Sequence, residues 1–240
     1  MNAGKMISIL ASFALLALFS GAVLAAGAGT VTHLSGTLSA QRADGSVRIL
    51  SQKSEVNPGD VLTTQRDSYA QINFTDGSSM TMRPQTQLRI ERYTFIQDQP
   101  GADSTFLRLL KGGLRTVTGL IGKRGNLDAY KIGTNTATIG IRGSSGDTID
   151  NSDGNCEGVT PGCEKLEPGV YHATYTGTYI MENEGGTQLV REGEFGVARD
   201  LKIKPDVLPG NPGLELGQLP FTLGVGNGRL QGPGAECAVR

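Results

Sequence analysis

The chain has 240 residues, with 22 basic and 23 acidic side chains, a net charge of −1 and no tryptophan. This balance disfavours a nucleic-acid-binding protein, because it offers no excess of basic side chains to attract phosphate. Two histidines and three cysteines leave few ligands for a transition metal, and 35 glycines indicate a turn-rich β protein rather than a helical bundle.

The first 25 residues are predicted to be an export signal. Lys5 gives the segment a positive start, residues 6–19 are apolar apart from two serines, and residues 23–25 lead to a predicted cleavage before Ala26. The apolar run is shorter than the roughly 18 residues of a membrane-spanning helix. An uncleaved anchor is the alternative. We expect a periplasmic or secreted chain with no membrane span after cleavage.

Alternation of apolar and polar residues predicts strands through the middle of the chain. Three strands are expected within residues 68–91, with Asp76-Gly77 as a tight turn. Leu107–Leu110 fits a strand or a helix. After residue 170, glycines separate four further predicted strands, at 171–174, 179–182, 188–191 and 195–198. Short strands at this spacing indicate a sandwich, a barrel or a short β-solenoid.

Cysteine spacing predicts a disulfide. Cys156 and Cys163 bracket a short loop, and an oxidising compartment would let them pair. A metal knuckle is the alternative, but the spacing is too long and no histidine lies nearby. Cys237 remains as a free thiol or an intermolecular bridge. Residues 146–170, which contain the pair, are predicted to be an irregular loop.

The C-terminal segment differs in composition from the rest of the chain. Five prolines and many glycines interrupt residues 204–240, so little apolar surface is available to offset the entropy of ordering. This segment is predicted to be a disordered tail. Docking of residues 214–223 as an extended strip is the alternative.

The order of these motifs resembles the FecR domain. The matching stretches are Gly59–Thr64, Ser68–Ala70, Phe74–Ser78, Pro84–Ile90, Lys111–Arg115, Tyr130–Thr134 and Ala137–Gly143. The resemblance covers residues 29–145, and residues 171–203 resemble a hairpin continuation of the same domain. It implies an all-β extracytoplasmic module, similar to a short twisted solenoid or sandwich, that is used for protein contact.

The chain also departs from the family pattern. After Arg142-Gly143 the family usually has threonine and then an aromatic residue, whereas Ser144–Asp147 and the cysteine loop follow here. Better-known relatives carry a sigma-factor-regulating segment and a transmembrane helix ahead of the domain. Residues 1–28 are too short for both, so a direct anti-sigma role is not expected.

Turn chemistry accounts for the motif residues without a binding role. Gly59 and Gly77 permit positive φ, and the carboxylates of Asp60 and Asp76 can accept hydrogen bonds from turn amides. The Arg142-Gly143 pair is interpreted in the same way. Arg115 and Arg142 are expected to pair with such carboxylates or to lie on a solvated face.

No catalytic or cofactor constellation is predicted. Gly143–Gly146 is one residue short of a nucleophile elbow, and His33 and His172 are expected to be ordinary strand histidines. Gly122-Lys123 lacks the glycine and hydroxyl residue of a phosphate loop. A loose calcium site is the weakest alternative, with the candidate ligands Asp147, Asp150 and Asp153. We therefore expect no enzyme, no cofactor and no metal.

The predicted function is non-enzymatic binding in the cell envelope, in signalling or assembly. A partner protein would pair with an edge strand or contact a strand face such as Tyr69-Gln71-Asn73. The alternative is glycan binding, which would require Tyr171, Tyr175 and Tyr179 to form one exposed platform. A secreted enzyme and a protein that polymerises through exposed edges are further alternatives.

Overall fold

The computed structural model describes residues 27–126, 128–217 and 219–220, and nearly all of their regular structure is β. The strands are β1 (Gly29–Ser35), β2 (Leu38–Gln41), β3 (Val47–Leu50), β4 (Glu55–Val56), β5 (Val61–Thr64), β6 (Tyr69–Phe74), β7 (Ser79–Met82), β8 (Gln87–Thr94), β9 (Ser104–Val117), β10 (Tyr130–Gly133), β11 (Thr138–Asn151), β12 (Gly169–Asn183), β13 (Gly186–Arg191), β14 (Phe195–Ala198) and β15 (Asp206–Leu208). Two short 3-10 turns, η2 (Pro100–Ala102) and η3 (Cys163–Lys165), complete the set. The all-β prediction is confirmed. The predicted export signal and Cys237 lie outside the described residues.

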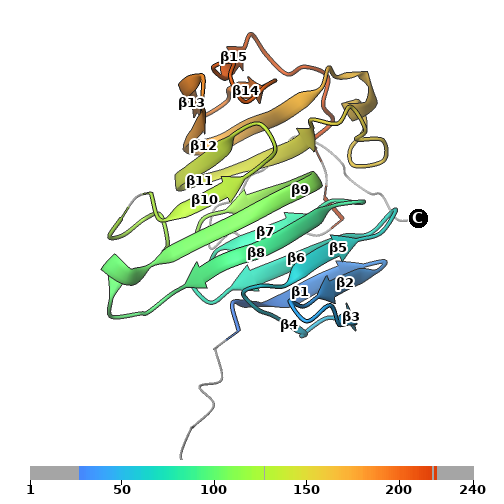
Figure 1. Cartoon of the computed structure of the whole chain (residues 1–240), viewed down its shortest axis with the longest axis vertical. Coiled ribbons are helices and arrows are strands. Elements are labelled where there is room, and N and C mark those ends of the chain that lie inside the picture. Colours follow the sequence, from blue (N-terminus) through green and yellow to red (C-terminus); the bar gives the residue numbers. More distant parts are fainter. Residues whose placement is uncertain (1–26, 127, 218, 221–240) are drawn as a thin grey trace, which may run out of the picture.

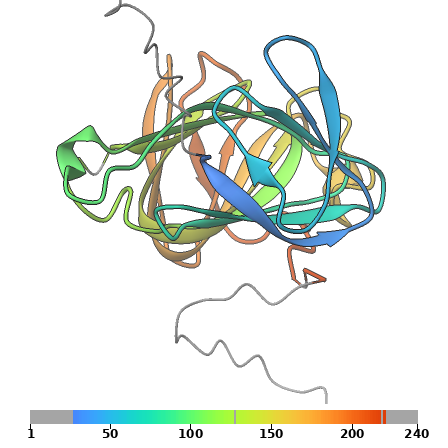
Figure 2. The same ribbon diagram turned by 90° about the horizontal axis from the view of Figure 1, so that it is seen from below.

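All the strands belong to one sheet, and they stack along the long axis of the molecule (Figure 1). The main hydrogen-bonded order is β15-β14-β12-β11-β10-β9-β7-β6-β1-β4, and β2, β3, β5, β8 and β13 attach beside this path. Seen from below, the strands line both sides of a flattened interior (Figure 2). No helix among the described residues is long and apolar enough to cross a bilayer.

The long strand β9 joins the two halves of the sheet. Its first part pairs with β8 and runs parallel to β10, whereas its second part pairs with β7 and β11. The change of partners falls at Gly112, which has a φ of 88°. A Cβ at Gly112 would lie 2.6 Å from the Cα of Thr86, so only glycine fits this close approach. Leu107–Leu110 is therefore part of a strand, not a helix.

The apolar alternation that predicted the strands also fills the core. Ala70 and Ile72 on β6 and Met80 and Met82 on β7 are fully buried in the main cluster, which runs from β1 to β14. A second, smaller cluster gathers around the cysteine loop, with Ile149, Tyr171 and Val197 among its members.

Two predicted boundaries are wrong. The strands expected at 171–174 and 179–182 are one strand, β12, because Gly177, with a φ of 74°, lies opposite a bulge in the pairing with β11 and does not form a turn. The irregular loop expected from residue 146 begins only after Asn151, since β11 continues through Asp147 and pairs with β9 and β12 on its two sides.

The expected disorder does not apply to the described part of the C-terminal segment. Residues 206–208 form β15 beside β14, and Leu214 and Leu216 are buried in the second cluster. Asn211 organises the approach, because its Oδ1 accepts hydrogen bonds from the amides of Gly213 and Leu214. Residues 218 and 221–240 lie outside the described residues.

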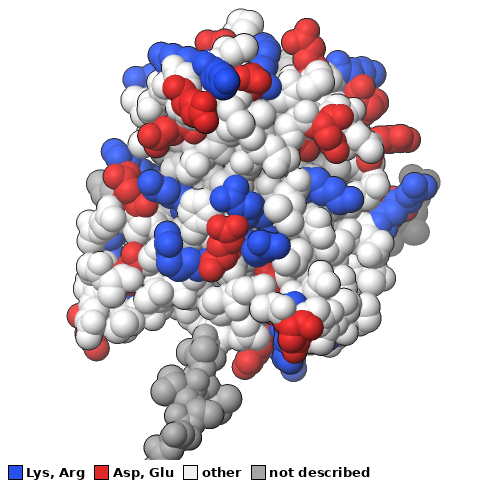
Figure 3. Space-filling view, in the orientation of Figure 1, with Lys and Arg blue, Asp and Glu red and all other residues white. Residues whose placement is uncertain are grey.

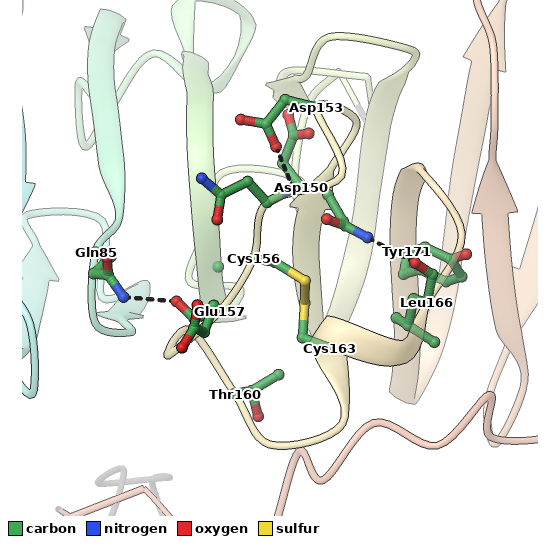
Figure 4. Close-up of a disulfide and its surroundings, with 12 residues drawn as sticks. Gln85, Asp150, Asp153, Cys156, Glu157, Thr160, Cys163, Leu166 and Tyr171 are labelled. Atoms are coloured by element: carbon green, nitrogen blue, oxygen red, sulfur yellow. Dashed lines mark hydrogen bonds between the residues drawn. A yellow bond between two sulfur atoms is a disulfide. The ribbon is translucent and has the colours of Figure 1, made fainter.

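The predicted disulfide between Cys156 and Cys163 is present, with 5.8 Å between the two Cα atoms, and both residues are buried (Figure 4). The loop that it closes is tied to the body of the sheet. Gln85 donates a hydrogen bond of 2.6 Å from Nε2 to the carbonyl of Glu157. The loop is therefore a packed part of the fold.

Replacing Cys156 and Cys163 by serine is expected to lower the free energy of unfolding by about 2–3 kcal/mol, because the bond closes a short loop in the unfolded chain. Urea denaturation measures this difference. Cys237→Ser is the matched control, since it leaves the disulfide intact. A loss below about 1 kcal/mol in the double variant would show that the bond contributes little to stability.

Candidate functional site

Four of the described strands pair on one side only, and they are the edges of the sheet. These strands are β3, β4, β13 and β15. An edge strand leaves backbone groups that can pair with another chain. Edge-strand contact, one of the two predicted binding modes, therefore has four candidate places. The predicted face Tyr69-Gln71-Asn73 lies on β6, which is not an edge because it pairs with both β1 and β7. The side chain in the middle of this face, Gln71, is buried.

The edge strand β3 differs from the other three in its exposed apolar side chains. Val47 is 63% exposed and Ile49 is 71% exposed, the two highest values among large apolar side chains of the described residues. Leu50 lies on the opposite face and is buried. Both exposed residues are β-branched and therefore stiff in an extended backbone. β3 thus presents a rigid apolar stripe beside an unpaired backbone edge, a feature that our sequence analysis missed.

A buried carboxylate holds β3 in place. Nη2 of Arg48 donates 2.8 Å hydrogen bonds to Oδ2 of Asp60 and to the carbonyl of Glu55. Asp60 is almost fully buried, and the same oxygen accepts the amide of Asn57 at 3.0 Å. Asp60 therefore serves the turn, as the Gly59-Asp60 motif predicts, and also ties the edge strand to β4 and β5.

A hollow of about 410 Å³ lies at the Val47 end of β3. It is lined by Arg42, Ala43 and Asp44 of the β2–β3 turn and by residues 57–60 of the β4–β5 turn. Basic and acidic side chains are interspersed over the face shown in Figure 3, with no broad region of one sign. The hollow offers space for a partner side chain at the end of an added strand.

The other predicted turn motifs have structural contacts. Oδ1 of Asp76 accepts the amide and hydroxyl of Ser78 at 3.1 and 2.6 Å, and Oδ2 accepts the amide of Ile121 at 3.1 Å. Gly77 follows with a φ of 81°. Arg142 pairs at 2.8 Å with the exposed Asp128, beside Gly143 with a φ of 63°. None of these contacts forms a cleft or a convergent polar site.

The three tyrosines do not form an exposed platform. Tyr179 is fully buried in the main core, and Tyr171 is buried in the second cluster, with its hydroxyl donating to the carbonyl of Glu167. Tyr175 is half-buried and donates a 2.5 Å hydrogen bond to Oδ2 of Asp147. The reason is that β12 lies inside the sheet, so its inward face packs instead of meeting solvent. The prediction of a tyrosine surface is wrong.

Asp147 organises a buried polar cluster, hereafter the Asp147 cluster, which also contains Arg83, Arg115 and Tyr175. Arg115 binds Asp147 with two hydrogen bonds, of 2.9 and 2.7 Å, and Arg83 adds a third at 2.9 Å. The side chains of Asp147 and Arg83 are almost fully buried. Burial and the neighbouring Asp147 raise the pKa of Tyr175 above its ordinary value, so its hydroxyl stays protonated and donates.

His172 lies fully buried beside this cluster. Its Nδ1 is 3.0 Å from the hydroxyl of Thr148, and its ring packs on that of Tyr179 with 4.0 Å between centroids. Burial lowers the pKa of His172 to about 3, against a smaller opposing effect of Asp147. The ring is therefore neutral at pH 7 and acts as a packed core residue.

The candidate calcium ligands do not converge. Asp147 is committed to two guanidinium groups, whereas Asp150 and Asp153 accept the amides of Ser152 and Asn155 (Figure 4). Within the described part of the chain, no three acidic, histidine or cysteine side chains are grouped to hold a metal ion.

Comparison with known families identifies the central part of this sheet. Residues 60–160 match the model of the family described as FecR protein. The chain contains a FecR domain. The match includes β5 to β11 and most of the disulfide loop, whereas the resemblance in the sequence covers residues 29–145.

Two crystal structures of a candidate anti-sigma factor from Parabacteroides distasonis ATCC 8503, at 1.65 and 2.50 Å resolution, are similar to this chain. The sequences are 10% and 11% identical, and the TM-score is 0.43 for both. Each alignment covers 62% of this chain and 58% of the other. No curated protein matches the chain.

Stability is expected to decrease as the pH falls from 6.5 toward 3, because His172 is protonated in the unfolded chain but stays neutral in the folded state. Above pH 6.5 the buried His172 does not lower the free energy of unfolding, because its ring is neutral in both states. Between pH 6.5 and 3 the free energy of unfolding falls with a slope that approaches about 1.4 kcal/mol per pH unit. Urea denaturation from pH 7 to 4 measures the slope.

The variant His172→Phe keeps an aromatic ring but cannot take up the proton, so its stability should depend less on pH across this window than that of the wild type. Equal slopes for the wild type and His172→Phe would exclude His172 as the source.

Proposed function

We propose that this chain is a non-enzymatic, extracytoplasmic binding module that contacts another protein in envelope signalling or assembly. The contact is made at the free edge of β3, where an extended segment of the partner adds a strand. The partner's backbone pairs with that of β3, and its apolar side chains pack on Val47 and Ile49.

The observation that carries this proposal is the exposure of Val47 and Ile49 on an unpaired strand. Soluble proteins usually protect such edges with charged side chains or cover them. Here the charged residue of β3, Arg48, is turned away to bind Asp60, which leaves the apolar stripe without a charge on its own strand. A contact surface explains this arrangement better than a stability role does.

Two further features support a non-enzymatic, extracytoplasmic module. A FecR domain at residues 60–160 favours regulation over catalysis, and the buried disulfide favours an oxidising compartment. The glycan-binding alternative depended on a tyrosine platform, and Tyr171 and Tyr179 are buried. A protein partner is therefore the better supported ligand.

The test is photo-crosslinking in the envelope of the native cell. A photoreactive amino acid at position 49 is expected to give one discrete protein adduct, because this side chain faces the added strand. Val47→Lys in the same chain should lower the adduct yield about tenfold, since a lysine on the edge opposes strand addition.

Leu189 provides the matched control, because it is an exposed apolar residue on β13, another edge strand. The photoreactive group at position 189 should not give the adduct. Equal adducts from positions 49 and 189, or no adduct from position 49 in a chain with wild-type circular dichroism, would contradict the proposal.

A further inference from the structure

The C-terminal strap, residues 209–217, packs on the disulfide loop and the Asp147 cluster, and the surface that it covers is hereafter the groove. Its contacts to the loop are made by the backbone of Glu215. The amide of Glu215 donates to the carbonyl of Pro161 at 3.0 Å, and its carbonyl accepts the hydroxyl of Thr160 at 2.8 Å. The side chain of Glu215 is exposed. The contacts of the groove with Glu215 therefore do not depend on which side chain is at this position.

The side chains that the groove does contact belong to the residues on either side of Glu215. Leu214 and Leu216 are buried against the disulfide cluster. Ahead of them, a Cβ on Gly162 would lie 2.0 Å from the carbonyl oxygen of Gly213, so the loop leaves no room for a side chain at position 162. The groove thus selects an extended segment of the pattern Leu-x-Leu that approaches along Gly162.

The floor of the groove carries an unbalanced charge. Both Arg83 and Arg115 pair with Asp147, so two guanidinium groups share one carboxylate. Both also donate to the carbonyl of Leu216, at 3.1 and 2.5 Å. Nε of Arg83, a side chain that is 98% buried, has no hydrogen-bond partner among the described residues. A buried positive charge is costly unless an anion or several acceptors compensate it.

A carboxylate at the position of the Leu216 carbonyl would neutralise this charge and add a second acceptor oxygen. Guanidinium groups bind carboxylates with shorter and stronger hydrogen bonds than they make with neutral carbonyls. The free C-terminus of a peptide ending in Leu-x-Leu would therefore suit the groove better than the internal strap does.

We propose that this groove is a binding site for the C-terminal end of another protein that ends in Leu-x-Leu, with its terminal carboxylate on Arg83 and Arg115. In the intact chain the strap occupies the same place as a tethered substitute, which offers only the neutral carbonyl of Leu216 to the two arginines. The incoming terminus displaces the strap, which is connected to β15 only through Pro209 and the glycine-rich residues that follow. This inference does not depend on the edge of β3.

The test uses the full chain and two fluorescent peptides with the sequence of residues 210–216, one ending in a free carboxylate and one in an amide. The variant Leu214→Ser/Leu216→Ser frees the groove. We expect it to bind the acid peptide about tenfold more tightly than the amide in fluorescence anisotropy. The wild type should bind both more weakly, because the tethered strap competes at an effective concentration on the order of millimolar.

Arg115→Gln in the same background should remove the preference for the acid. Equal binding of the two peptides, or no binding to a variant with wild-type circular dichroism and an intact disulfide, would overturn the proposal.

A second measurement uses the wild type, so that the proposal can be tested even if the variants do not fold. In the wild type, excess acid peptide should accelerate hydrogen exchange at the amide of Glu215 more than excess amide peptide does. Unchanged exchange at millimolar acid peptide would also overturn the proposal.

Discussion

The structure depends most on one buried carboxylate, that of Asp147. It lies on β11, directly opposite Arg115 on β9, and it also binds Arg83, which follows β7, and Tyr175 on β12. Through the two arginines it is connected to the C-terminal strap. One side chain therefore links three neighbouring strands and the C-terminal strap. Because both arginines are largely buried, removal of this carboxylate would leave two positive charges uncompensated in the interior.

A second buried carboxylate, Asp60, has the same kind of role beside β3, where it holds Arg48 and with it this edge strand. In both places a short polar residue fixes an element that would otherwise be weakly attached. At β3 the result is an exposed apolar edge, and at the strap it is a groove with unbalanced charge. The fold thus provides two surfaces of different chemistry, and we propose that one binds an added strand and the other a chain terminus.

Local chemistry in the sequence predicted much of this fold. Alternation gave the strands around Ile72 and Met80, and Cys156 and Cys163 were close enough in sequence to suggest their bond. The burial of a side chain could not be predicted in this way where it depends on residues that are far away in the sequence. Arg83 and Asp147 are 64 residues apart, and Leu216 lies a further 69 residues along the chain, so neither the cluster nor the docking of the strap has a local signal. Tyr179 has the spacing of an exposed stripe, but its neighbours on β11 and β13 enclose it.

The most direct test of this account is the stability of Asp147→Asn, measured by urea denaturation together with hydrogen exchange. The account predicts a loss of about 3–5 kcal/mol, because asparagine keeps the shape but cannot compensate the two guanidinium groups. It also predicts that protection at Glu215 on the strap decreases more than protection at Ile72 on β6. A variant within about 1 kcal/mol of the wild type, with the strap still protected, would contradict the central role of Asp147.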